Sequence, residues 1–136
     1  MPNQRVLLVE DDSMNMRLAQ HILEVEGYTV LKATTAQEAL EQIESTLPDL
    51  VLMDVQLPDV DGMTVVRVLR ENAITRDTTI VALTACVMKG DREMMLQTGC
   101  NGYIAKPINV QDFIDTVRSF LSLRTGTKRN EKGACY

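Results

Sequence analysis

The stretch Leu50-Val51-Leu52-Met53-Asp54 decides the predicted fold. Four consecutive apolar residues without polar alternation indicate a strand that is buried on both faces, as in a parallel sheet. A carboxylate inside such a strand needs a partner, so Asp54 is expected just past the strand's carboxyl end. Open parallel α/β sheets bind their ligands along that edge. Asp54 is therefore the first candidate functional residue.

Similar segments recur on both sides of this stretch. Further strands are predicted at residues 6–9, 29–33, 80–83 and 102–105, and a helical pattern follows each of the five strands. This alternation favours a doubly wound α/β fold, in which five helices cover both faces of a five-stranded parallel sheet. From residue 124 onward the chain has little to bury. We therefore predict a domain at 1–123 and a flexible basic tail at 124–136.

Local signals predict where the helices begin and which faces they bury. Asp12 or Ser13 is expected to cap the first helix, and a capping box is predicted for the second. The residues of that box are Thr35 and Glu38. Spacing by three or four residues predicts the inward face of the first helix. That face comprises Met14, Leu18, Ile22 and Val25.

Composition and charge narrow the class of protein. The chain has 136 residues, of which 45% are hydrophobic and 24% charged, as in a soluble globular domain. No apolar run approaches the ~20 residues of a membrane span, and three cysteines without metal-ligand spacing suit a reducing cytoplasm. The tail holds four basic residues and one glutamate and so carries a charge of +3. Because the whole chain carries −5, the remaining body carries −8. This acidic body argues against nucleic-acid binding.

Residues suited to phosphoryl chemistry follow four of the predicted strands. They are Glu10 and Asp11, Asp54, Thr84 and Lys106. In a parallel sheet these positions share one edge, so the side chains are expected to converge. Carboxylates ~4 Å apart repel by ~4 kcal/mol per pair at an effective dielectric near ~20, and Mg²⁺ relieves that repulsion. The set therefore predicts Mg²⁺-dependent phosphorylation of Asp54, with Lys106 and Thr84 binding phosphoryl oxygens.

Other acidic residues near this edge have simpler explanations. Asp59 and Asp61, in the segment after Asp54, are expected to be solvated loop residues rather than metal ligands.

The motifs that surround these residues resemble those of the receiver domain of bacterial two-component response regulators. They are Val-Glu-Asp-Asp (9–12), Leu-Met-Asp-Val-Gln-Leu-Pro (52–58), Gly62, Leu-Thr-Ala (83–85) and Gly-Tyr-Ile-Ala-Lys-Pro (102–107). The resemblance spans roughly residues 5–123. Its finer pattern is similar to that of stand-alone receivers in bacterial cell-division control. It implies a flavodoxin-like sheet with strand order 2-1-3-4-5.

The resemblance also implies a role for each residue. Asp54 would accept a phosphoryl group from a phosphohistidine of a histidine kinase or a histidine phosphotransfer protein. Mg²⁺ would be held by Glu10, Asp11 and Asp54 with the backbone carbonyl of Gln56. Gln56 and Cys86 would tune the lifetime of the phosphoryl group.

A switch of surface is implied as well. Thr84 would move toward the phosphoryl group and Tyr103 would turn from exposed to buried, which changes the surface of the fourth helix, fifth strand and fifth helix. A downstream effector protein would bind the changed surface. The Lys106–Pro107 bond is expected to be cis. Because no output domain follows in the sequence, the chain is expected to be a phospho-accepting switch whose only chemistry is its own phosphorylation and dephosphorylation, and not an enzyme. The alternative is a relay that passes the phosphoryl group on to another protein.

Two other functions share part of this pattern. A phosphatase of the haloacid dehalogenase type also uses an aspartyl phosphate, but it needs a second Asp where this chain has Gln56. A flavin- or nucleotide-binding domain of flavodoxin-like shape needs a phosphate-cradling loop, whereas residues 10–16 are acidic and lack glycine. Incubation with Mg²⁺ and acetyl phosphate separates the alternatives, because a switch is labelled and a phosphatase turns over.

Overall fold

The computed structural model describes residues 4–55, 57–84, 93 and 96–123 of the chain. The strands are β1 (Arg5–Val9), β2 (Thr29–Ala33), β3 (Leu50–Asp54), β4 (Ile80–Thr84) and β5 (Gly102–Ala105). The labelled helices are α1 (Ser13–Val25), α2 (Ala36–Thr46), α3 (Gly62–Glu71) and α5 (Val110–Leu123). Between β4 and β5, residues 93 and 96–98 are helical, as the predicted alternation requires, whereas residues 91, 92, 94 and 95 and the whole tail predicted at 124–136 lie outside the described residues.

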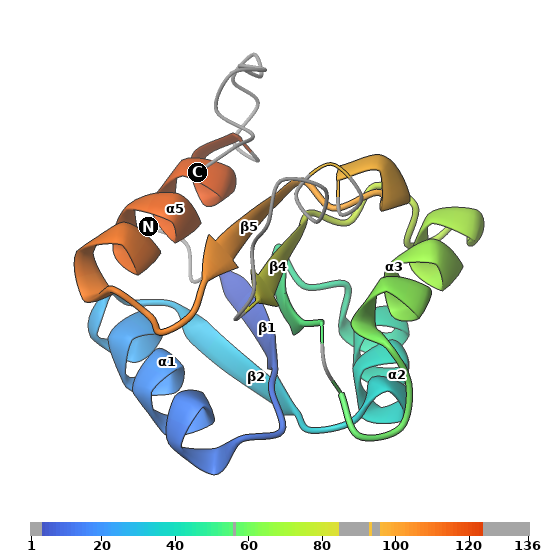
Figure 1. Cartoon of the computed structure of the whole chain (residues 1–136). Helices are drawn as coiled ribbons and strands as arrows, with labels where there is room; N and C mark the ends of the chain where they lie inside the picture. Colours follow the sequence, from blue (N-terminus) through green and yellow to red (C-terminus); the bar gives the residue numbers. More distant parts are fainter. Residues whose placement is uncertain (1–3, 56, 85–92, 94–95, 124–136) are drawn as a thin grey trace.

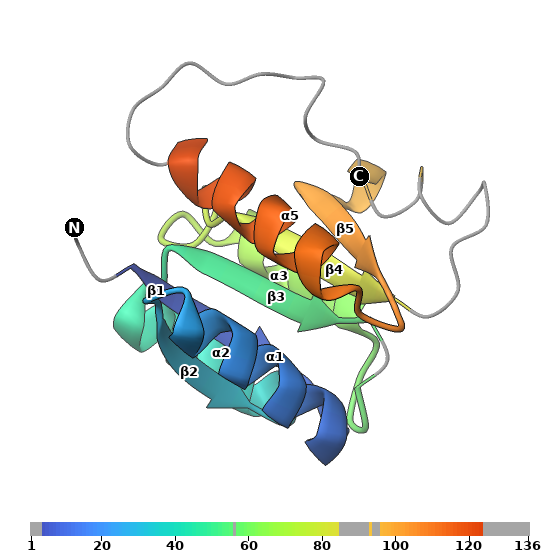
Figure 2. The ribbon, with the colours of Figure 1, turned by 90° about the vertical axis from the view of Figure 1, so that its left-hand side faces the viewer.

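All five strands run parallel in the order β2-β1-β3-β4-β5, which confirms the predicted doubly wound α/β fold. Figures 1 and 2 show α1 and α5 on one face of the sheet and α2 and α3 on the other. Because the central strand β3 pairs with β1, the carboxyl ends of these two strands lie side by side. Val9 at the end of β1 pairs in register with Met53, the residue before Asp54.

The apolar run of β3 builds both halves of the core. Val51 and Met53 point to the α2–α3 face, and Leu50 and Leu52 point to the α1–α5 face. All four side chains are fully buried, and Asp54 at the strand's end retains 4% of its exposure. An unbroken apolar sequence is needed because helices cover both sides of this strand.

The inward face of α1 differs from the prediction. Asp12 is the cap, since its carboxylate accepts hydrogen bonds from the first turn. The buried positions are Met16, Ala19, Ile22 and Leu23. Of the predicted positions only Ile22 is buried, whereas Met14 is 76% and Val25 69% exposed. Two apolar stripes of helical spacing occur along this helix, and the stripe that contains Ala19 is the one packed in the core against the sheet.

The predicted capping box of α2 is present with one change of partner. Thr35 accepts a hydrogen bond from the Glu38 backbone N–H at 3.2 Å. The Glu38 carboxylate accepts from the N–H of Thr34, at 2.8 Å, rather than from that of Thr35. Asn109 accepts from the N–H of Asp112 and so caps α5.

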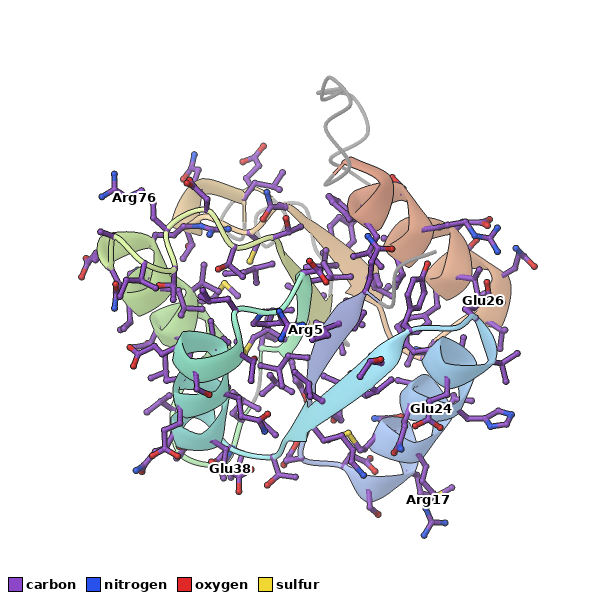
Figure 3. All side chains as sticks on the ribbon, turned by 180° about the vertical axis from the view of Figure 1, so that it is seen from behind. Arg5, Arg17, Glu24, Glu26, Glu38 and Arg76 are labelled. Carbon is purple, nitrogen blue, oxygen red and sulfur yellow. The ribbon has the colours of Figure 1, made fainter. Side chains whose placement is uncertain are left out.

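Arg70, on α3, connects the segments that precede β4 and β5, at the end of the sheet opposite to Asp54. Its guanidinium donates to the carbonyl oxygens of Gly99, Arg76 and Thr78 and to the side-chain oxygen of Asn101, at 2.7–3.0 Å. Other charged side chains, such as Arg17 and Arg76, point away from the body of the molecule (Figure 3). Among the described helices none has the length and apolar character to cross a membrane.

Candidate functional site

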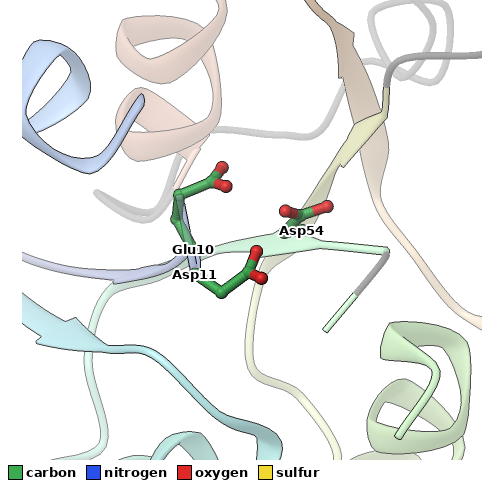
Figure 4. A group of neighbouring side chains, drawn as sticks. All are labelled: Glu10, Asp11 and Asp54. Carbon is green, nitrogen blue, oxygen red and sulfur yellow. The ribbon is translucent and has the colours of Figure 1, made fainter. Parts of the chain in front are cut away.

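Three carboxylates meet at the carboxyl ends of β1 and β3. Glu10 and Asp11 follow β1 directly, and Asp54 is the last residue of β3. The three side chains can each offer an oxygen such that these atoms lie within 4.8 Å of one another. Figure 4 shows the carboxylates gathered between the two strand ends. Glu10 and Asp54 are buried whereas Asp11 is exposed, so the cluster is open to solvent on one side.

Lys106 reaches this cluster from the segment after β5. Its ammonium nitrogen lies 3.0 Å from Glu10 Oε1 and 3.1 Å from Asp54 Oδ2. Its backbone N–H donates to the carbonyl oxygen of Thr84 at 2.8 Å, and this hydrogen bond holds the backbone of Lys106 in place at the end of β4. The Lys106–Pro107 peptide bond is cis, as expected. One cation therefore bridges two carboxylates from strands far apart in the sequence.

The surroundings of Glu10 and Lys106 shift the pKa of each of these two groups. Burial raises the pKa of the Glu10 carboxyl, Lys106 opposes the rise, and the neighbouring Asp54 adds to it. Burial alone lowers the pKa of the Lys106 ammonium, but hydrogen bonds and attraction to the two carboxylates outweigh burial and raise it. The single ammonium thus compensates only part of the negative charge.

We expect Glu10→Gln to gain stability relative to the wild type as pH rises, in the absence of divalent cations. Because the pKa of Glu10 is raised on folding from its ordinary 4.5, the folded state holds a proton that the unfolded state has lost. The stability linked to that proton is complete below the ordinary pKa and declines as pH rises through the raised one. Each pH unit in this window costs up to ~1.4 kcal/mol.

Urea unfolding in EDTA at several pH values from about 4 upward measures this effect, because glutamine does not titrate. A difference between variant and wild type that stays constant across the series contradicts the assignment of the raised pKa to Glu10.

The donor set fits a magnesium ion. Hard carboxylate oxygens are the ligands that Mg²⁺ takes, together with several waters, and the exposed Asp11 side leaves the cluster accessible. Glu10 Oε1 is fully buried, and its partner among the described residues is the Lys106 ammonium, 3.0 Å away. An ionised carboxylate has about four lone-pair sites, so the ammonium leaves Glu10 with capacity to coordinate a metal ion as well.

The remaining predicted residues divide into described and undescribed positions. Thr84 ends β4, is buried, and follows Leu83, the in-register neighbour of Asp54. Tyr103 is 8% exposed and lines a cavity of about 400 Å³ between β5 and α5. This buried position is the one expected of it after phosphorylation, and the movement between two positions stays a prediction. Gln56 and Cys86 lie outside the described residues.

The structure gives both loop acids roles that the sequence analysis did not predict. Asp61 caps α3, because its carboxylate accepts from the N–H of Met63 at 3.1 Å. Asp59 accepts from the N–H groups of Ala36 and Gln37, at the start of α2. The signal for Asp61 was present, since an aspartate directly before a helix is a favoured cap. Asp59 gave no such signal because its partners are 22 and 23 residues away.

Comparison with known proteins agrees with this geometry. Residues 6–118 match the family model of the response regulator receiver domain. Similar curated proteins include the polar-differentiation response regulators DivK of Brucella ovis and Brucella anthropi. Each is 42% identical to this chain over 116 residues, which cover 85% of this chain and 94% of the relative.

Solved structures show the same likeness. The receiver domain of the sensor histidine kinase PA1611 from Pseudomonas aeruginosa has a TM-score of 0.82 and 34% identity, over 89% of this chain and 99% of that one. That crystal structure holds a magnesium ion in its active-site cleft. A CheY-like receiver domain protein from Methanospirillum hungatei has a TM-score of 0.83 and 29% identity, over 91% and 98% of the two chains.

Proposed function

Because the chain belongs to the response regulator receiver domain family, we propose that it is a phosphorylation switch whose acceptor is Asp54. One observation carries the proposal: Glu10, Asp11, Asp54 and Lys106 converge at one end of the sheet from three separate strands. The convergence supplies a nucleophilic carboxylate, a cation-binding acidic set and a fixed ammonium within one small site.

The proposed reaction transfers a phosphoryl group from a phosphohistidine of a histidine kinase or phosphotransfer protein. A carboxylate oxygen of Asp54 attacks phosphorus, the P–O bond forms, and the P–N bond breaks with its electron pair leaving on the imidazole nitrogen. A bound magnesium ion would offset the negative charge of the carboxylates and of the incoming phosphoryl oxygens.

Lys106 and Thr84 then act on the phosphoryl group. Lys106 already lies 3.1 Å from Asp54 Oδ2, so its ammonium is placed to meet a phosphoryl oxygen with little movement. Thr84 offers a hydroxyl from the end of the adjacent strand. The positive charge of Lys106 and a hydrogen bond donated by the Thr84 hydroxyl would both stabilise the phosphorylated form of Asp54.

The output is a change in protein binding. The phosphoryl group adds charge and acceptor oxygens, and Thr84 and Tyr103 respond to it. A partner that prefers the resulting surface beside β5 and α5 binds more tightly after phosphorylation. We propose that this partner is a downstream effector protein and that the chain turns over no external substrate beyond its own phosphorylation and dephosphorylation. The comparisons do not favour the alternative of a phosphoryl relay.

Incubation with radiolabelled acetyl phosphate and MgCl₂ tests the proposal. We expect the label to approach about one phosphoryl group per chain and then plateau, and we expect EDTA to prevent labelling. Inorganic phosphate released steadily without retained label indicates a phosphatase instead. Capture of effectors by the beryllofluoride-loaded protein, compared with unloaded protein, tests the output step, and equal capture by both contradicts a switch.

A further inference from the structure

The segment that follows Asp54 is held at its base by two backbone hydrogen bonds. The N–H of Val55 donates to the carbonyl oxygen of Leu83 at 3.1 Å, and the N–H of Gly62 donates to that of Val55 at 2.9 Å. A Cβ atom on Gly62 would lie 2.5 Å from the carbonyl oxygen of Asp54, so only glycine permits this close approach. Val55 and Gly62 therefore fix, beside the acceptor, the two ends of a loop whose described residues are 57–61.

The tip of this loop is attached to a different part of the chain. Asp59 Oδ1 accepts a hydrogen bond from the N–H of Ala36 at 2.9 Å, and Oδ2 accepts from the N–H of Gln37 at 3.2 Å. These donors belong to the first turn of α2, where backbone N–H groups have no acceptor within the helix. The carboxylate also lies at the positive end of the helix dipole. Consistent with this, the hydrogen bond from Ala36 is the main cause that lowers the pKa of Asp59.

Helix α2 does not depend on Asp59 for its own cap. Thr35 already accepts from the N–H of Glu38, so the helix start is capped locally. The Asp59 contact is an additional, long-range one, and the element that depends on it is the loop. Val55 and Leu57 pack partly buried against the core, which holds the base of the loop but not its tip.

We propose that Asp59 is a positioning residue of the phosphoryl site: its carboxylate holds the tip of this loop on the N-terminus of α2 and so sets the described residues 57–61 before a divalent cation binds beside Asp54. The inference rests on the proposed function. A loop that is ordered in advance loses less conformational freedom on binding, which raises affinity without adding a contact to the ion.

Magnesium titration followed by amide NMR shifts of the whole protein tests this inference. We expect Asp59→Ala to raise the dissociation constant for Mg²⁺ about three- to tenfold, while Asp59→Asn, which keeps one acceptor oxygen, gives an intermediate value. Thr35→Ala is the matched control, because it removes a cap from the same helix end without touching the loop. We expect it to bind Mg²⁺ like the wild type, even though urea unfolding shows a loss of stability.

Amide hydrogen exchange gives a second readout. In Asp59→Ala the amides of Ala36 and Gln37 should exchange faster than in the wild type. Wild-type Mg²⁺ affinity in Asp59→Ala, or an equal loss in Thr35→Ala, overturns the inference and leaves the proposed function standing. Failure of the wild-type protein itself to bind Mg²⁺ overturns both.

Discussion

Replacement of Asp54 by asparagine is expected to reduce phosphoryl labelling by acetyl phosphate from about one group per chain to background. An amide oxygen carries no negative charge and does not form a stable acyl phosphate, so no phosphoryl group is retained in the site. The fold should survive, because the change also removes a like charge that lies near Glu10. Intact-mass spectrometry after incubation with MgCl₂ and acetyl phosphate measures the loss directly.

Asp12→Asn is the matched control for this experiment. Asp12 is an exposed carboxylate next to the cluster, and its role is to cap α1, which asparagine performs as well as aspartate. Labelling of this variant should equal that of the wild type. Retained stoichiometric labelling of Asp54→Asn would place the acceptor elsewhere, and the proposed function would have to be abandoned in its present form.

The sequence predicted the position of a residue correctly where that position depends only on the neighbouring residues in the chain. The apolar run at 50–53 has to be a doubly covered strand, and a charge after such a run has to lie at the sheet's edge. The same argument placed Glu10, Asp11 and Lys106, because parallel strands end along one edge whatever their order. The family resemblance added the strand order 2-1-3-4-5, which the structure confirms.

The sequence was less informative where a side chain's partner is distant along the chain. Asp59 binds the start of α2, and Arg70 binds backbone oxygens up to 29 residues away. In α1 two apolar stripes have helical spacing, and only packing against the sheet selects Met16 and Ala19 over Met14 and Val25. Tertiary packing decides such cases, and periodicity alone cannot.

Lys106→Met should cost roughly 3–5 kcal/mol of stability in EDTA, because it leaves the buried Glu10 and Asp54 carboxylates without their shared cation. The methionine keeps most of the side chain's volume, so the loss reports charge rather than packing. Urea unfolding measures it. Lys32→Met, an exposed lysine on β2, is the control and should change stability little.

The response of Lys106→Met to magnesium and to acid shows whether its loss of stability comes from the missing charge or from altered packing. Saturating MgCl₂ should stabilise the variant more than the wild type, since three carboxylates without the ammonium bind a divalent cation more tightly, and the gain in stability grows with that affinity. Lowering the pH should also narrow the gap, because Glu10, whose pKa is already raised in the wild type, takes up a proton in place of the lost partner. A deficit that neither magnesium nor acid reduces would mean that Lys106 stabilises the protein by packing, and the charge balance proposed for the phosphoryl site would then be wrong.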